Sequence, residues 1–228
     1  MRRIQNLMEQ WLFIGPDNRQ EQVNLPHTWN AKDGQDGGND YYRGTCHYEK
    51  TFEKPEFDPE AEEVYLEFLG VNASSDVTVN GKELAHHDGG YSTFRINITE
   101  VLEDRNKLEV TVDNSVNGKV YPQKADFTFY GGIYRDVRFL IVSKEHFDLD
   151  YLGSNGIKIT PEVKENEANV HIETFTNTEE AQVNVQIKDQ DGKVVAEGNG
   201  CDVNLNIQNP IRWHGRKNPY LYTAVATL

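Results

Sequence analysis

The sequence has little cysteine and no long apolar run. Its 228 residues include two cysteines, Cys46 and Cys201, far apart in the chain. Two cysteines do not form a disulfide framework, so we expect two unpaired thiols, with a single disulfide as the alternative. No segment approaches the roughly 20 apolar residues of a membrane helix. The apolar run from Trp11 to Ile14 is too short for a signal-peptide core of about 7–15 residues. We therefore expect no membrane partner, and either a cytoplasmic protein or a periplasmic or secreted one whose signal has been removed.

Positive charge is also in short supply. Lys and Arg total 23 against 37 Asp and Glu, which gives a formal net charge of −14. The acidic residues are dispersed along the chain, and their field would repel a polyanion. Nucleic acid is therefore excluded as an expected partner, whereas a neutral ligand such as a sugar meets no such penalty.

Helical patterning is scarce, and alternation of apolar and polar residues with a period of two dominates instead. The expected strands cover 64–70, 76–84, 107–114, 134–142, 156–163, 168–175, 181–189, 193–198 and 202–208. Asn80-Gly81 and Asp191-Gly192 are predicted to form tight turns, because these residue types tolerate the positive φ that such turns need. Only 4–11 and 98–103 could form a helical turn or two, with Thr99 as a candidate cap. We expect an all-β protein.

The two halves of the chain differ in the length of their turns and in the spacing of their strands. Up to about residue 145 the turns are long and aromatic, at 26–47, 85–95 and 114–132. Beyond it, short strands recur at intervals of roughly 8–12 residues, which is the rhythm of an immunoglobulin-like sandwich. The predicted domains are 1–146 and 147–228, with no flexible linker between them.

Three loops of the first half combine glycines with aromatic residues and with carboxylates or amides, at 23–44, 86–94 and 121–137. Aromatic faces stack on sugar rings, and polar side chains bind sugar hydroxyls, so these loops indicate a carbohydrate site. The alternative is long sandwich loops with tyrosines packed beneath them. The neighbours His86 and His87 point to opposite faces of a strand, so we interpret them as surface histidines and not as ligands of one metal.

The order of several motifs resembles the N-terminal part of glycoside hydrolase family two. These motifs are PHTWN (26–30), YYRGTCHYEKTF (41–52), the segment 64–99, DFTFYGGIYRDVRFL (126–140) and NPIRWHGRKNPYLYTAVATL (209–228). The resemblance implies a galactose-binding-like jelly roll at 1–146 and an immunoglobulin-like sandwich at 147–228. It also implies a following (β/α)₈ barrel that carries two catalytic glutamates and lies outside this sequence.

On this resemblance, the chain is a non-catalytic fragment of a retaining, β-galactosidase-like hydrolase and is inactive alone. Its expected partners are its own catalytic barrel and a β-galactoside-like carbohydrate, with homo-oligomerisation of the full-length parent as a further option. The fragment is expected to need no cofactor, and a monovalent cation or Mg²⁺ is a candidate in the full-length enzyme.

The resemblance also assigns substrate-binding residues. Counting back from the strand that begins at Gly132, Asp126 takes the position that binds galactosyl hydroxyls and a monovalent cation; a turn-capping role is the alternative. Asn39 or Asp40 is the expected counterpart of a nearby amide-bearing loop. Trp29 and Tyr42 are expected either to line the pocket or to pack in the core.

Two further interpretations stay open from the sequence alone. Jelly-roll sandwiches also act as free-standing carbohydrate-binding modules, and a purely structural sandwich pair would bind no sugar. Within the enzyme interpretation, Asp126 favours a galactosidase. The three loops show no evident cluster of Arg or Lys to pair with a uronate, which disfavours a glucuronidase. Arg135 and Asp136 are expected to form a structural ion pair or a turn contact.

Overall fold

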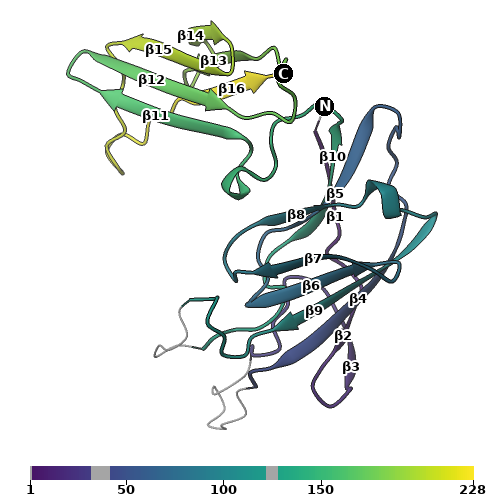
Figure 1. The fold of residues 1–228 in the computed structure, drawn as a ribbon. Coiled ribbons are helices and arrows are strands. Elements are labelled where there is room, and N and C mark those ends of the chain that lie inside the picture. The colour runs from purple at the N-terminus through teal and green to yellow at the C-terminus, as the bar shows by residue number, and fades with distance from the viewer. Residues whose placement is uncertain (1, 32–41, 122–127) are drawn as a thin grey trace. The chain divides into compact units, whose positions relative to one another are not determined.

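The computed structural model describes residues 2–31, 42–121 and 128–228. The chain divides into two compact units, Met1–Lys144 and Glu145–Leu228, close to the boundary that we expected between 146 and 147. Both units are built from antiparallel strands (Figure 1). The expected all-β fold class is confirmed.

The first unit is a sandwich of two sheets. One sheet has the order β3 (Gln20–Val23), β2 (Trp11–Ile14), β4 (Thr45–Glu53), β9 (Arg105–Asp113), β6 (Ser74–Val79) and β7 (Lys82–Asp88). The other has the order β1 (Arg3–Asn6), β10 (Val137–Ser143), β5 (Glu62–Phe68) and β8 (Phe94–Asn97), and a 3₁₀ turn, η1 (Thr99–Val101), follows β8.

Alternation places the core of this sandwich. Every second residue of β9 is buried, and β4 shows the same pattern at Cys46 and Tyr48. These side chains meet Leu66 of β5 and Phe139 of β10 in one apolar cluster. Burying each large apolar side chain contributes about 1.5–3 kcal/mol, so the two inner faces hold the sheets together.

The predicted turn at Asn80-Gly81 joins β6 to β7, and both residues have positive φ, 52° and 77°. Asn80 also fixes this hairpin from its side chain, because its Nδ2 donates to Val101 O at 2.9 Å. The second predicted turn lies between β13 (Asn184–Lys188) and β14 (Val194–Asn199), where Gly192 has φ 80°. Both turns use residues that tolerate the left-handed region at little cost.

Of the two helical expectations, the one for 4–11 was wrong, and the one for 98–103 was confirmed except for its cap. Residues 4–11 do not form a helical turn, since Arg3–Asn6 pairs with β10 and Trp11 begins β2. Sheet pairing satisfies the backbone groups of this segment and outweighs its weak helical pattern. Residues 98–103 do contain the single turn η1, but Thr99 does not cap it. Instead, Thr99 Oγ1 accepts a hydrogen bond from Val64 N at 2.9 Å.

The second unit is also a sandwich. One sheet has the order β11 (Ile157–Val163), β12 (Glu167–Thr174) and β15 (Asp202–Gln208), and the other has the order β14 (Val194–Asn199), β13 (Asn184–Lys188) and β16 (Thr223–Thr227). A 3₁₀ turn, η2 (Tyr151–Gly153), precedes β11. The apolar faces of β12, β13 and β15 form its core.

Both cysteines are unpaired, as expected: Cys46 is buried in the first unit and Cys201 is half-buried in the second. Within the described ranges, no helix has the length and apolar character needed to cross a membrane.

Candidate functional site

Two buried asparagines join the loops at one end of the first sandwich. Asn30 and Asn114 are both fully buried, and Asn114 Nδ2 donates to Asn30 Oδ1 at 3.2 Å. The same oxygen accepts from Gly131 N at 2.7 Å, while Asn30 Nδ2 donates to Tyr42 O at 2.8 Å. We call Asn30 and Asn114 the amide cluster. It ties together three segments that are distant in sequence.

Asn114 makes further hydrogen bonds to the same loop segments. Its Oδ1 accepts from Gly44 N at 2.8 Å, and its Nδ2 also donates to Phe129 O at 2.8 Å. Arg43 Nε donates to Asn114 O at 2.8 Å, and the guanidinium lies over the Phe129 ring, 4.7 Å from its centroid. A buried polar group without a partner costs about 1–3 kcal/mol. These amides therefore specify how the loops meet.

Glycines allow this close approach. A Cβ on Gly131 would lie 2.1 Å from the Trp29 ring, and one on Gly132 would lie 2.6 Å from His27 O. Gly132 also has φ 129°, which an L side chain rarely adopts, and it exchanges backbone hydrogen bonds with Asn72. The glycine pair in the sequence is thus required by the packing of the loops.

Aromatic side chains surround the amide cluster. Tyr91, Tyr121 and Tyr130 are 55%, 87% and 42% exposed. Tyr91 and Tyr121 also help line a cavity of about 10 Å³ with Arg43 and Asn114, which is roughly the space that one water molecule needs. Exposed rings at a loop end can stack on the C–H face of a sugar.

The titratable groups beneath the loops are held neutral. His27 Nδ1 lies 2.8 Å from Tyr48 Oη. Burial lowers the pKa of His27, because it disfavours the imidazolium, and raises the pKa of Tyr48, because it disfavours the phenolate. This pair therefore supports the loops as a neutral hydrogen bond and is not positioned as an acid or a nucleophile.

The structure places only part of the predicted site. Trp29 is half-buried, stacks on Phe13 with ring centroids 6.1 Å apart, and donates from Nε1 to Tyr42 O at 3.3 Å. Tyr42 Oη donates to Thr45 O at 3.3 Å. Both side chains pack within the loop end, and their contact with substrate stays a prediction.

The remaining predicted residues, Asn39, Asp40 and Asp126, lie outside the described residues, so their substrate and cation roles also stay predictions. Arg135 makes a turn contact, since Nη1 donates to Leu69 O at 3.3 Å and to Tyr91 O at 3.2 Å.

The amide cluster was not among the sites predicted from the sequence, although a signal for Asn114 was present. Leu108, Val110 and Val112 are the buried positions at the end of β9, and Asn114 continues their period of two. An asparagine in register with buried valines must find partners inside the protein. Asn30 follows no regular strand and offered no comparable signal.

The neighbouring histidines lie on β7 and not in a loop. His86 Nδ1 and Nε2 lie 2.6 Å from Asp76 Oδ1 and 3.1 Å from Asp88 Oδ2. His87 turns away and stacks on Phe94 with ring centroids 4.2 Å apart. Over the described part of the chain, no group of three or more His, Cys, Asp or Glu could hold a metal ion.

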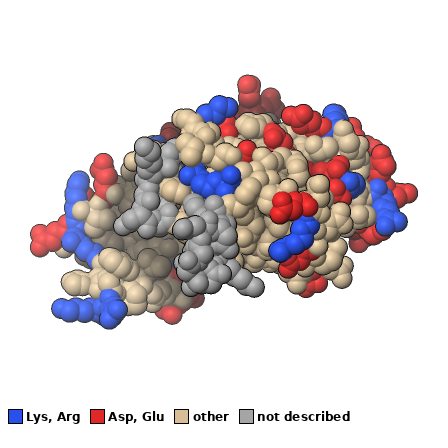
Figure 2. All heavy atoms as spheres, turned by 90° about the horizontal axis from the view of Figure 1, so that it is seen from below, with Lys and Arg blue, Asp and Glu red and all other residues tan. Residues whose placement is uncertain are grey.

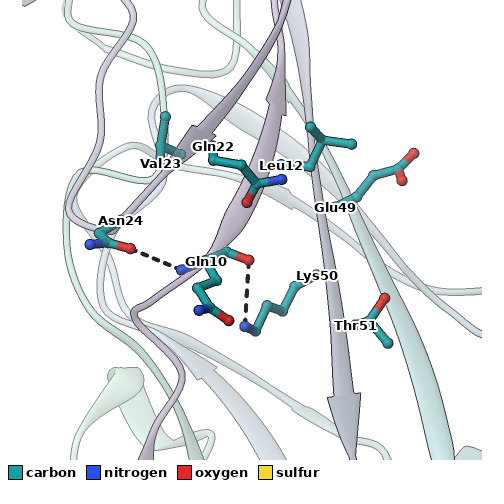
Figure 3. Close-up of a pocket in the computed structure, with 8 residues that line it drawn as sticks. All are labelled: Gln10, Leu12, Gln22, Val23, Asn24, Glu49, Lys50 and Thr51. Atoms are coloured by element: carbon teal, nitrogen blue, oxygen red, sulfur yellow. Dashed lines mark hydrogen bonds between the residues drawn. The ribbon is translucent and has the colours of Figure 1, made fainter.

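A wider groove of about 710 Å³ lies beside β2, β3 and β4, and Figure 3 shows its lining. Lys50 Nζ donates to Glu9 O at 2.8 Å and to Gln10 O at 3.5 Å, and Gln10 N donates to Asn24 Oδ1 at 2.9 Å. Its lining consists of amides and aliphatic side chains together with Glu49, Lys50 and Thr51, and it includes no aromatic ring. The loop end with its tyrosines is therefore the better candidate site.

Two family models match this chain in succession. The galactose-binding domain-like model of glycosyl hydrolase 2 matches residues 38–148, and the glycosyl hydrolases family 2 model matches residues 154–228. The chain belongs to glycosyl hydrolase family 2. The resemblance drawn from the motifs is confirmed, as is the galactose-binding-like sandwich followed by an immunoglobulin-like one.

Known members of the family cover the whole chain. A β-glucuronidase of Bacteroides fragilis is 34% identical over 90% of the chain and 32% of its own length. A β-galactosidase of Thermoanaerobacter pseudethanolicus is 28% identical over 100% of the chain and 33% of its own length. The crystal structure of an FMN-binding β-glucuronidase from Faecalibacterium prausnitzii L2-6 superposes with a TM-score of 0.92 at 38% identity, over 99% of the chain and 36% of its own. The chain thus spans about a third of the length of these relatives and corresponds to their N-terminal part.

Proposed function

We propose that the protein is a retaining glycoside hydrolase of the β-glucuronidase type, to which this chain contributes the non-catalytic part of the substrate site. The observation that supports this proposal most directly is the amide cluster, which fixes the loops of a galactose-binding-like sandwich around three exposed tyrosines. A glucuronide is the first candidate substrate because relatives named β-glucuronidase reach 34% identity over 90% of the chain and 38% over 99%. Relatives named β-galactosidase or putative β-galactosidase reach 28% over 100%, 30% over 99% and 33% over 58% of it.

A β-galactoside is the second candidate. The position of Asp126 before the Gly132 strand favours it, as does the match of the Thermoanaerobacter pseudethanolicus β-galactosidase over 100% of the chain. Both substrates present a pyranose ring and hydroxyls to this loop end, and they differ at the carboxylate of the uronic acid. Opposite charge would have to meet that carboxylate.

Retaining hydrolysis needs two carboxyl groups about 5–5.5 Å apart, one as acid and one as nucleophile. Asp113 is a described carboxylate beside the amide cluster, and its oxygens already accept hydrogen bonds from groups of the loops. It accepts from Ser115 N at 2.6 Å and from Thr45 Oγ1 at 3.0 Å. We therefore place both catalytic carboxylates in the remaining two thirds of the protein, in a (β/α)₈ barrel.

Within this proposal, the first unit binds and orients the sugar. Asp126 and either Asn39 or Asp40 accept hydrogen bonds from sugar hydroxyls, and Asp126 also ligates a monovalent cation. The exposed tyrosines offer stacking faces, while Trp29 and Tyr42 support the loops from beneath. Acidic and basic side chains are interspersed on the face seen in Figure 2, as suits a small sugar substrate better than a polyanion.

The test compares hydrolysis of 4-nitrophenyl β-glucuronide and 4-nitrophenyl β-galactoside by the full-length protein. We expect the glucuronide to be preferred, and no turnover of either substrate by the 228-residue chain alone. Asp126→Asn should lower kcat/KM about 10- to 100-fold, the worth of one hydrogen bond to a charged group. Asp104→Asn, on an exposed residue, is the matched control and should leave kcat/KM unchanged.

Robust hydrolysis by the 228-residue chain alone would contradict the proposal that the catalytic carboxylates lie outside this chain. Saturable binding of an oligosaccharide by this chain, combined with an inactive full-length protein, would favour a carbohydrate-binding module instead.

A further inference from the structure

A network of polar side chains links the hairpin of β6 and β7 to the segment 114–121. Asp88 is the last residue of β7, and its side chain is 19% exposed. Its Oδ1 accepts a hydrogen bond from Ser74 Oγ at 2.7 Å, and its Oδ2 lies 2.9 Å from Lys119 Nζ and 3.1 Å from His86 Nε2. One carboxylate therefore connects both strands of the hairpin to the segment.

The network continues into the segment through Asn117. Its Nδ2 donates to Ser74 Oγ at 3.3 Å, while its Oδ1 accepts from Lys119 N at 2.9 Å and from Val120 N at 3.0 Å. Hydrogen bonds thus run without a break from Asp88 through Ser74 and Asn117 to the backbone of the segment. We call these three residues the loop clamp.

The segment itself has apolar or buried anchors only toward its ends. Asn114 begins it in the amide cluster, and Val120 is 6% exposed and lines the small cavity beside Tyr121. Between these ends, Val116 is 68% exposed and the side chain of Lys119 is 70% exposed. Segments with few buried apolar contacts open easily, so the order of this segment depends on its polar contacts.

The charge on Asp88 makes these contacts stronger than a lone surface pair. An exposed pair such as Lys119 with a carboxylate contributes little by itself. Asp88, however, receives three donors at once. The hydrogen bonds from Ser74, Lys119 and His86 hold the pKa of Asp88 below its usual range, so the carboxylate is ionised at neutral pH. Hydrogen bonds to an ionised acceptor are roughly twice as strong as neutral ones.

We propose that Asp88 is a positioning residue of the sugar site, which acts through the loop clamp to fix the backbone that presents the ring of Tyr121. The inference rests on the proposed function, in which the exposed tyrosines stack on the pyranose. Tyr121 is 87% exposed, so its ring is held mainly by the backbone that carries it. Asp88 does not touch the sugar and acts only through that backbone.

Amide exchange of the full-length protein tests the clamp directly. Asp88→Asn keeps the size of the side chain and removes the charge that pairs with Lys119. Exchange at the amides of Lys119 and Val120 should become faster, although both amides bind Asn117 and not Asp88. Asn117→Ala removes their acceptor outright and sets the upper limit of the effect.

The matched control is Asp76→Asn. Asp76 lies on β6, its side chain is 48% exposed, and its Oδ1 lies 2.6 Å from Nδ1 of the same His86 that contacts Asp88. This variant makes the same chemical change and disturbs the same histidine, but it leaves the loop clamp intact. Exchange over the segment and the kinetic constants should both stay unchanged.

Kinetics on 4-nitrophenyl β-glucuronide test the link to the sugar. Tyr121→Ala should raise KM about 2- to 10-fold, the worth of one aromatic stacking contact, and Asp88→Asn should raise it about 2- to 5-fold. In both variants kcat should stay unchanged, because the ring binds ground state and transition state alike. Once Tyr121 is alanine, Asp88→Asn should change KM no further, because residues that act through one another are not additive.

Unchanged exchange at Lys119 and Val120 in Asp88→Asn would overturn the proposal. An increase in KM that persists in full in the Tyr121→Ala background would overturn it as well, as would a fall in kcat at constant KM. If the unaltered full-length protein hydrolyses neither nitrophenyl substrate, the proposed function fails, and the exchange rates still decide whether Asp88 holds the segment.

Discussion

Glu67→Gln is expected to destabilise the first unit by about 3–5 kcal/mol. Glu67 lies on β5 with a fully buried side chain, surrounded by the guanidinium groups of three arginines. Arg95 Nε lies 2.7 Å from Oε1, Arg138 Nε contacts Oε2, and Arg2 Nη2 lies 3.7 Å from Oε1. Glutamine keeps the size of the side chain, so the change removes charge without opening a cavity.

The size of this loss in stability depends on how far each arginine can reach water once Glu67 has lost its charge. The side chain of Arg95 is only 4% exposed, whereas those of Arg138 and Arg2 are 24% and 32% exposed. Arg138 and Arg2 can turn toward water, but Arg95 would remain a buried cation that has lost its ion pair with Glu67. Breaking a buried pair in this way costs several kcal/mol, far more than the 0–1 kcal/mol of an exposed pair.

Urea titration and calorimetry of the 228-residue chain provide the assay. The transition of the first unit should fall by roughly 6–20 °C, at about 2–4 °C per kcal/mol for a domain of this size. Glu109→Gln is the control, because Glu109 pairs with Lys107 while its side chain is 39% exposed. That variant should change stability by less than about 1 kcal/mol.

The double variant Glu67→Met with Arg95→Met separates charge from packing. Replacing both partners by apolar residues of similar volume should recover much of the loss, since no buried charge is left unpaired. If Glu67→Gln is no less stable than Glu109→Gln, or if the double variant is worse than Glu67→Gln, the buried ion pair of Glu67 and Arg95 does not stabilise the first unit as argued.

Three further outcomes are expected. Asn114→Ala should cost about 1–3 kcal/mol for each buried partner left without a hydrogen bond, with faster amide exchange at Gly44 as its signature, because Gly44 N donates to Asn114 Oδ1; an unchanged exchange rate would contradict the role of the amide cluster. In native protein at pH 8, Cys201 should react with a thiol reagent and Cys46 should not, because burial raises the pKa of Cys46 to about 12; equal rates for the two thiols would argue against this. Hydrogen bonds to Asp76 and Asp88 raise the pKa of His86, so its contribution is present below its ordinary pKa and is lost as the pH rises through the raised value. His86→Asn should therefore destabilise at pH 5.5 but hardly at pH 9, and a loss that is equal at both values would refute the assignment.

The sequence by itself determined the class of fold and the family. Alternation with a period of two marked most strands of both units, since a half-buried sheet needs apolar residues on one face only. Asn80-Gly81 marked a hairpin for an equally local reason, because few other residue pairs accept two successive positive φ values. The order of the motifs gave the family, which the two family models then confirmed.

The way in which the strands and loops come together follows from the tertiary structure. Residues 4–11 looked locally helical, but residues 4–6 pair with β10 and Trp11 pairs with β3, because pairing across the sheet outweighs a weak local preference. The amide cluster joins Asn30 to Asn114 and Gly131, which are 84 and 101 positions away in the chain. The positions of β11 and β16 at the ends of their sheets were likewise invisible in the sequence, because each strand has an ordinary local pattern. Which edge stays unpaired depends on the neighbours that the fold supplies, and a linear pattern does not record them.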